Sequence, residues 1–166
     1  MRKCDNIRNK NLRKGRCTVF KRKIYSKMQE WKKDSNGKTA LLIEGARRIG
    51  KSTVVEEIAK NEYDSYILID FSRASKETKE LFEDVSDLNF LFLQLQLQFK
   101  VDLQERKSVI IFDEVQLCPA ARQAIKVLVA DRRYDYIETG SLISINKNVK
   151  DILIPSEERK ISMYPM

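Results

Sequence analysis

The sequence contains no histidine, and its three cysteines (Cys4, Cys17 and Cys118) are an odd number without the spacing of a disulfide framework. The lack of histidine excludes catalysis by an imidazole. Together with the cysteine spacing, it argues against a zinc site and against a disulfide-stabilised scaffold. So few unpaired cysteines fit a reducing compartment, and we expect a cytoplasmic location.

Long apolar segments are missing as well. No run approaches the roughly 18 residues that a membrane-spanning helix needs, so no membrane association is expected. The basic N-terminus is not followed by the apolar segment of a signal peptide. Repeats and low-complexity segments are also absent. At 166 residues, the chain is long enough for one globular domain with a sizeable core and too short for two ordinary ones.

The net charge of +8 is concentrated near the N-terminus. Residues 1–23 contain ten lysines or arginines and one acid, a net charge of +9, which leaves −1 for residues 24–166. Such a basic segment can bind phosphate backbones or an anionic surface, or it can be a solvated extension. We expect a basic, disordered tail at residues 1–20, through which nucleic acid is one conceivable partner, and a nearly neutral domain at residues 21–166.

The most informative segment is residues 45–52, a complete G-x-x-x-x-G-K-[ST] phosphate-binding loop. Its two glycines let the backbone N–H groups curl around phosphate oxygens. Lys51 is placed to reach the β- and γ-phosphates, and the Ser52 hydroxyl to ligate Mg²⁺. The sequence therefore predicts a site for ATP with Mg²⁺. Its residues are Gly45, Ala46, Arg47, Arg48, Ile49, Gly50, Lys51, Ser52 and Thr53.

The flanking residues supply the strand and the helix that this loop requires. Thr39–Glu44 is an apolar run of strand length, and residues 51–60 read as a helix with acids in its early turns. Within the loop, Arg47 and Arg48 occupy variable positions. We expect their side chains outside the phosphate cradle, where one of them could still meet nucleotide or a partner.

A second motif lies downstream, where Ser108–Glu114 is an apolar strand that ends in two acids. Such a strand is typical of a parallel sheet covered on both faces, and its carboxyl end lies at the rim where α/β sheets bind ligands. This is the Walker B pattern. Asp113 is placed to hold Mg²⁺, often through a water, and Glu114 to orient or deprotonate the water that attacks the γ-phosphate. An isolated pair of acids would simply begin a solvated loop, but beside a phosphate-binding loop the pair favours hydrolysis over binding alone.

Helices and strands are expected to alternate along the rest of the chain. A helix at Lys21–Asp34 places Ile24, Tyr25, Met28 and Trp31 on one face. Further strands are expected at Tyr66–Phe71, Tyr134–Ser141 and Lys160–Tyr164, helices at Ser75–Phe82 and at Ala120–Val129 after Pro119, and a short apolar stretch at Ile152–Pro155. The prediction is an α/β three-layer sandwich around a mainly parallel sheet.

The segment Asp87–Phe99 supports two interpretations. Its leucines alternate with phenylalanine and glutamines, and this period of two favours a strand. However, a parallel sheet needs a crossover before the strand of the second motif, crossovers are usually helical, and Leu and Gln are good helix formers. We therefore predict a helix.

Together these stretches resemble the AAA-type ATPases of bacteria and archaea whose core precedes a C-terminal domain of unknown function. The resemblance covers about residues 20–166. It is carried, in order, by ALLIEGARRIGKST, YILIDFS, SVIIFDEVQLCPAARQAIK, YDYIETGSLISI and IPSEERKISMYPM. It implies a five-stranded P-loop NTPase sheet of order 5-1-4-3-2, with the Walker B motif on the third strand. It also implies that ATP hydrolysis drives a conformational change in a protein partner or in a C-terminal domain.

The resemblance assigns two further sites. The family's sensor residues follow the fourth strand and match Thr139 and Ser141, which would read the γ-phosphate or the attacking water. The sequence Thr-Gly-Ser is also simply good turn chemistry. Arg159 resembles an arginine that meets nucleotide or a neighbouring subunit, but here Glu158 replaces the family's preceding glycine, and an ordinary exposed arginine is an equal alternative.

The sequence departs from the family's pattern at its C-terminus. The family's cores continue through a P-[LM]-x-F-x-E-F-like segment, whereas this sequence stops at Pro165 and Met166. We therefore expect it to be an N-terminal fragment or a truncated product. Three functions stay open: an ATPase, a P-loop kinase acting on a small molecule, and a non-hydrolysing nucleotide switch or nucleic-acid adaptor. The Asp113–Glu114 pair argues against the kinase, because a glutamate beside the metal carboxylate suits activation of water.

Overall fold

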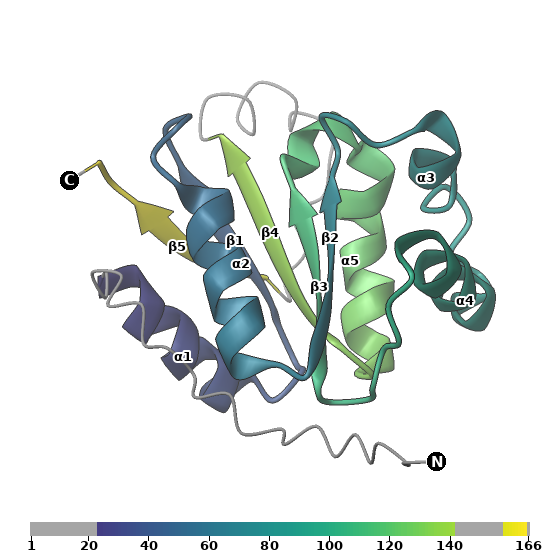
Figure 1. Ribbon diagram of the computed structural model, residues 1–166, viewed down its shortest axis with the longest axis horizontal. Coiled ribbons are helices and arrows are strands. Elements are labelled where there is room, and N and C mark those ends of the chain that lie inside the picture. Colours follow the sequence, from purple (N-terminus) through teal and green to yellow (C-terminus); the bar gives the residue numbers. More distant parts are fainter. Residues whose placement is uncertain (1–22, 142–157, 166) are drawn as a thin grey trace, which may run out of the picture.

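The structure, a computed structural model, describes residues 23–141 and 158–165, and in Figure 1 a sheet of five strands lies between two layers of helices. The strands are β1 (Ala40–Gly45), β2 (Ser65–Asp70), β3 (Ser108–Asp113), β4 (Asp135–Ser141) and β5 (Glu158–Met163). Their order is β2-β3-β4-β1-β5, and every pairing is parallel. The predicted P-loop NTPase sheet is confirmed, including the order 5-1-4-3-2 read from the other edge.

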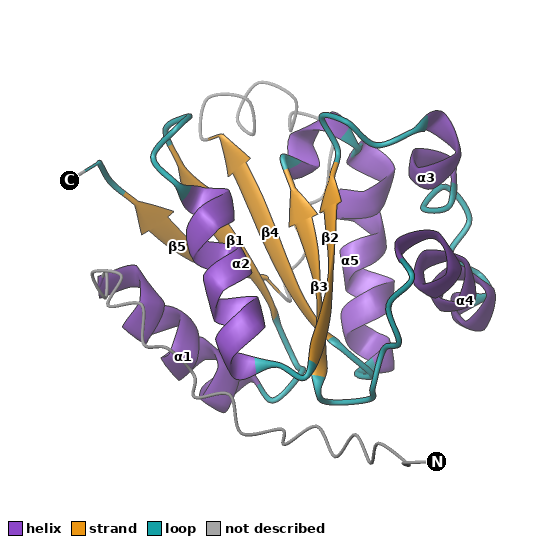
Figure 2. Cartoon of the chain, in the orientation of Figure 1, coloured by secondary structure: helices purple, strands orange, loops and turns teal. Residues whose placement is uncertain are grey.

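Helices cover both faces of the sheet (Figure 2). The helices α1 (Lys23–Ser35) and α2 (Lys51–Glu62) pack on one face. The other face carries α3 (Lys76–Glu80), α4 (Leu88–Phe99), the short 3₁₀ helix η1 (Val115–Leu117) and α5 (Pro119–Asp131). Because consecutive side chains of a strand point to opposite faces, each strand contributes to two separate cores.

β1 illustrates this division. Leu41 and Ile43 pack with the fully buried Trp31 of α1, whereas Ala40 and Leu42 join the core under α5. Trp31 Nε1 donates a hydrogen bond of 3.1 Å to Thr39 Oγ1, just before β1 begins. This contact fixes α1 against the strand that leads into the phosphate-binding loop.

Most of the predicted elements are confirmed, with ends that differ by one or two residues. The ambiguous segment is helical: α4 buries Leu91, Phe92 and Leu95 on one side, and the Asp87 side chain caps it by accepting from Phe90 N at 3.0 Å. Pro119 begins α5, and Ser75 caps α3 as expected. The predicted tail at residues 1–20 and the apolar stretch at Ile152–Pro155 lie outside the described residues.

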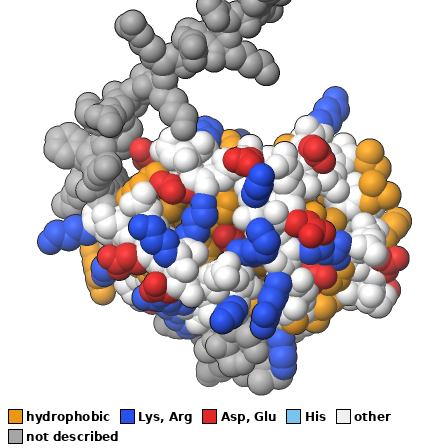
Figure 3. Space-filling view, turned by 90° about the horizontal axis from the view of Figure 1, so that it is seen from below, with side chains coloured by type: hydrophobic (Ala, Val, Ile, Leu, Met, Phe, Trp, Pro, Cys, Tyr) orange, Lys and Arg blue, Asp and Glu red, His pale blue; other side chains and the backbone are white. Residues whose placement is uncertain are grey.

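The parallel register brings the carboxyl ends of all five strands to one edge of the sheet (Figure 1). Gly45 lies opposite Ser141 of β4 and Met163 of β5, and Asp113 lies opposite Asp70 of β2. The loops that leave this edge hold the candidate site. Figure 3 shows the opposite end of the molecule, where basic and acidic side chains are interspersed, as expected for a nearly neutral domain.

Within residues 23–141 and 158–165, none of the helices has the length and the apolar character needed to cross a membrane.

Candidate nucleotide-binding site

The predicted phosphate-binding loop joins the end of β1 to the start of α2. Gly50 caps α2 in the left-handed region, with φ 85° and ψ 30°, a conformation that glycine adopts without steric cost. Gly45 is needed for a different reason. A Cβ atom there would lie 2.4 Å from the backbone oxygen of Met163 and 2.7 Å from Ile49 Cδ1. Each glycine of the motif therefore has its own structural role.

Lys51 is buried inside the loop, with 4% of its surface exposed. Its ammonium group donates to the carbonyl oxygens of Ala46 at 2.7 Å and of Gly45 at 3.2 Å. Burial lowers the pKa of Lys51, and Glu114 and Asp113 oppose that shift because their charges favour the ammonium form. The lysine and both acids of the second motif therefore share one electrostatic environment.

Two hydroxyl groups and one carboxylate connect the start of α2 to the ends of β3 and β4. Ser52 Oγ donates to Asp113 Oδ1 at 2.8 Å, and the hydroxyl of Thr139 donates to the same oxygen. Asp113 and Thr139 are buried, and Ser52 is half-buried. One carboxylate oxygen thus connects α2, β3 and β4.

Glu114 follows Asp113 in the left-handed conformation, with φ 55° and ψ 47°. Its backbone N–H donates to Thr139 Oγ1 at 3.2 Å, and its carboxylate accepts a hydrogen bond from the Gln116 amide. Glu114 is half-buried.

The structure places the sensor residues Thr139 and Ser141 inside β4, in agreement with the strand predicted at Tyr134–Ser141. Gly140 lies between them, and the resemblance's placement of these residues after the fourth strand is therefore wrong. They are buried strand residues rather than an exposed turn, because they pair with Ile43, Glu44 and Gly45 of β1. The turn alternative is therefore wrong, and Ser141 comes to lie beside the first glycine of the loop.

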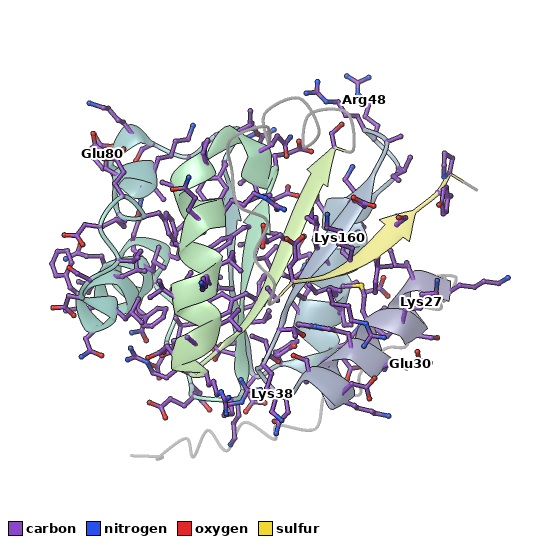
Figure 4. The ribbon with its side chains drawn as sticks, turned by 180° about the vertical axis from the view of Figure 1, so that it is seen from behind. Lys27, Glu30, Lys38, Arg48, Glu80 and Lys160 are labelled. Atoms are coloured by element: carbon purple, nitrogen blue, oxygen red, sulfur yellow. The ribbon has the colours of Figure 1, made fainter. Side chains whose placement is uncertain are left out.

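The remaining loop residues lie at the surface. Ala46, Arg47, Arg48 and Thr53 are exposed, and Ile49 is half-buried. Figure 4 labels Arg48 at the end of the molecule where the strands end, with its side chain extending outward. This agrees with the expectation that the two arginines lie outside the cradle.

Arg159 lies far from the loop along β5. It pairs with Leu41, whereas the loop begins at Gly45, four residues on, which is about 13 Å at the usual rise of a strand. Its guanidinium instead contacts Asp34 of α1 at 3.4 Å. The described geometry therefore places Arg159 out of reach of a nucleotide bound to the phosphate-binding loop of the same chain.

The start of α2 and the end of β3 carry the groups that ATP and Mg²⁺ require. The N-terminus of α2 faces the loop and attracts anions, and Lys51 adds a full positive charge. Ser52 and Asp113 present a hydroxyl and a carboxylate 2.8 Å apart, the oxygen ligands that Mg²⁺ prefers. The loop has no room for a Cβ at Gly45, as expected where the backbone itself forms the cradle. These residues fit a metal–triphosphate.

Sequence reasoning missed two buried polar features. Gln116 is buried beside Glu114, a contact that the sequence pattern did not predict. Arg122 of α5 is also buried, and it pairs with Glu138 at 2.9 Å and Glu158 at 3.0 Å. The only sequence signal for Arg122 is its position on the helix face that also carries Ala121 and Ile125.

A parallel sheet of this order with a phosphate-binding loop after β1 defines the chain as a P-loop NTPase. Comparison with protein families gives a narrower assignment, because the family described as "AAA domain" matches residues 37–166. The chain therefore belongs to this AAA domain family. Membership supports nucleotide binding as its general activity.

A search of curated proteins finds no match. Among solved structures, the chain is similar to C. elegans PCH-2, with a TM-score of 0.46 and 13% sequence identity over 86% of this chain. The match covers 42% of the PCH-2 chain, so this protein spans less than half of that length.

Proposed function

We propose that this protein binds Mg-ATP and hydrolyses it to ADP and phosphate. The observation that carries the proposal is the network in which Asp113 accepts from both Ser52 and Thr139 while Glu114 follows directly in sequence. A phosphate-binding loop alone would support binding only. A second carboxylate, half-exposed beside the metal carboxylate, adds a group that can act on water.

The phosphate groups would be bound by the loop and by Lys51. The loop's N–H groups and the N-terminus of α2 favour negative charge, and the lysine ammonium lies at the same place. Asp113 and Ser52 would hold Mg²⁺. The ion, when bound, neutralises charge on the β- and γ-phosphates.

Glu114 would act as the general base. Its carboxylate would orient the attacking water and take its proton as the water oxygen bonds to the γ-phosphorus and the bond to the β–γ bridging oxygen breaks. Thr139 would fix the positions of both acids relative to each other, because its hydroxyl donates to the Asp113 side chain and accepts from the Glu114 backbone. Ser141, at the end of β4 beside Gly45, would contact the γ-phosphate or the water.

Hydrolysis would be coupled to a conformational change in a protein partner or in a further domain. One side of α4 supports a partner surface, since Phe90, Leu93 and Leu97 are each more than half exposed and follow helical spacing. The network at Asp113 supports the coupling itself. It joins α2, β3 and β4 through a single oxygen of Asp113. A change in what Asp113 binds would therefore alter the contacts of both α2 and β4.

Two variants test binding and hydrolysis separately. Lys51→Ala should abolish binding of a fluorescent ATP analogue, while circular dichroism shows an unchanged fold. Lys60→Ala, which removes an exposed lysine of the same helix, is the matched control and should bind normally. Equal affinity of parent and Lys51→Ala would refute the assignment of the loop.

Glu114→Gln keeps the size and polarity of the side chain but removes the base. It should retain ATP affinity and lose turnover by about a hundredfold or more. Phosphate release is measured with and without DNA and small-molecule acceptors. Nucleotide binding without any turnover would instead favour a non-hydrolysing switch, and transfer of phosphate to an acceptor would favour a kinase.

A further inference from the structure

The carboxylate of Glu114 contacts the side chain of Gln116, which belongs neither to the phosphate-binding loop nor to the Asp113–Glu114 pair. Gln116 Nε2 donates a hydrogen bond of 2.5 Å to Glu114 Oε2. An ionised carboxylate only accepts hydrogen bonds, so the NH₂ side of the Gln116 amide must face it. We infer that Gln116 is a positioning residue that holds one oxygen of Glu114 so that the other is presented to the attacking water. This inference rests on the proposed hydrolysis.

The backbone makes this contact possible. After β3 ends at Asp113, the left-handed conformation of Glu114 turns the chain sharply into η1. Leu117 N donates to Glu114 O at 2.9 Å and closes the turn. Residues with a side chain rarely adopt this conformation. Here the turn brings the side chain of residue 116 back to that of residue 114.

Packing alone does not account for a glutamine at this position. Gln116 is 6% exposed, and its second polar atom, Oε1, is buried with no hydrogen-bond partner among the described residues. A buried amide oxygen without a partner is unfavourable, and a methionine or leucine would fill the same space without that cost. The favourable contact that the amide does make is the one to Glu114.

Glu114 is consequently fixed at two points. Thr139 Oγ1 accepts from its backbone N–H at 3.2 Å, and Gln116 holds Oε2 of its side chain. The other oxygen, Oε1, is the one that this proposal assigns to the attacking water. A general base works only within hydrogen-bond reach of the proton that it removes, so fixing its rotamer raises the fraction of productive complexes.

The test is a double-mutant cycle between Gln116 and Glu114. Gln116→Met keeps the length of the side chain and removes the donor. It should lower kcat about tenfold or more, while the KM for ATP changes by less than about twofold. Gln123→Met, the same change at an exposed position of α5, should leave both constants unchanged.

The decisive measurement combines the two changes. In the Glu114→Gln background, Gln116→Met should cause no further loss of kcat, because there is no longer a base to position. Single-turnover phosphate release makes these slow rates measurable. If Gln116→Met reduces kcat equally in both backgrounds, or leaves the parent rate intact, the positioning role is wrong.

If Gln116→Met fails to fold, Gln116→Asn takes its place in the cycle with the same expectations, since it retracts the amide by one methylene. A parent that binds ATP but never releases phosphate overturns the proposed hydrolysis and this role with it. A parent that responds to Glu114→Gln but not to Gln116→Met overturns this role alone.

Discussion

Ser52 Oγ donates a hydrogen bond of 2.8 Å to Asp113 Oδ1, although 61 residues separate the two in the sequence. The contact joins the first turn of α2 to the end of β3, so it exists only when the sheet has its native order. It also places two oxygen ligands for Mg²⁺ side by side. The same pair is therefore a structural contact and the core of the candidate metal site.

Asp113→Asn should weaken Mg²⁺-dependent ATP binding while leaving the fold intact. The amide oxygen can still accept from Ser52 and Thr139, but the negative charge that favours the metal is gone. We expect ATP affinity in the presence of Mg²⁺ to fall by about tenfold or more. Affinity measured in EDTA should change little. The metal role of Asp113 is wrong if the loss is the same in both conditions.

Gly45→Ala should reduce both stability and nucleotide affinity. The added Cβ would lie 2.4 Å from the Met163 carbonyl, so β1 and β5 must separate or the loop must shift. We expect the free energy of unfolding to fall by about 1–3 kcal/mol, as for other overpacked sites. Urea unfolding and ATP titration measure the two effects.

Ser162→Ala is the matched control for Gly45→Ala. It removes an exposed hydrogen bond from Ser162 to Glu44 across the same two strands without adding an atom near the loop. Its effect on stability should stay within about 0.5 kcal/mol. If both variants unfold alike, the close approach at Gly45 is not what limits the substitution.

The buried Arg122–Glu138–Glu158 cluster predicts an unusual pH dependence of stability. Burial raises the pKa of Glu138 from 4.5 to about 8; the Glu158 charge adds to this shift, and Arg122 opposes it. Between these values the folded chain binds more protons than the unfolded chain, so stability falls as pH rises. At about 1.4 kcal/mol per pKa unit, this amounts to a few kcal/mol between about pH 5 and 8.

Glu138→Gln removes this titration and keeps the shape of the side chain. Its free energy of unfolding should change less with pH than that of the parent over the same range. Glu80→Gln, which alters an exposed carboxylate of α3 (Figure 4), should leave the parent's pH slope unchanged. Urea unfolding at several pH values compares the three proteins. A slope as steep in Glu138→Gln as in the parent would assign the effect to other groups.

Local patterns were enough to predict much of this molecule. The phosphate-binding loop could be predicted because its glycines, lysine and serine lie close together in the sequence. The buried strands could be predicted because they are short apolar runs. The helical assignment of α4 also held, since a crossover between β2 and β3 needs a helix whatever its local period. The strand order came from resemblance to a family, not from the patterns themselves.

Other features depend on which residues the parallel register brings together. The resemblance placed Thr139 and Ser141 after the fourth strand, but pairing with Ile43 and Gly45 of β1 keeps them inside β4, where the Thr139 hydroxyl donates to Asp113. The pairing of Arg122 with Glu138 and Glu158 joins three elements and leaves no local signature.

Gln116 was missed for a different reason, because its contact with Glu114 depends on a left-handed turn that composition does not reveal. The sequence by itself determined which chemical groups are available and in what order the elements follow. The tertiary structure decided which of those groups meet, because a contact across the sheet depends on the register and twist of all the strands between its partners.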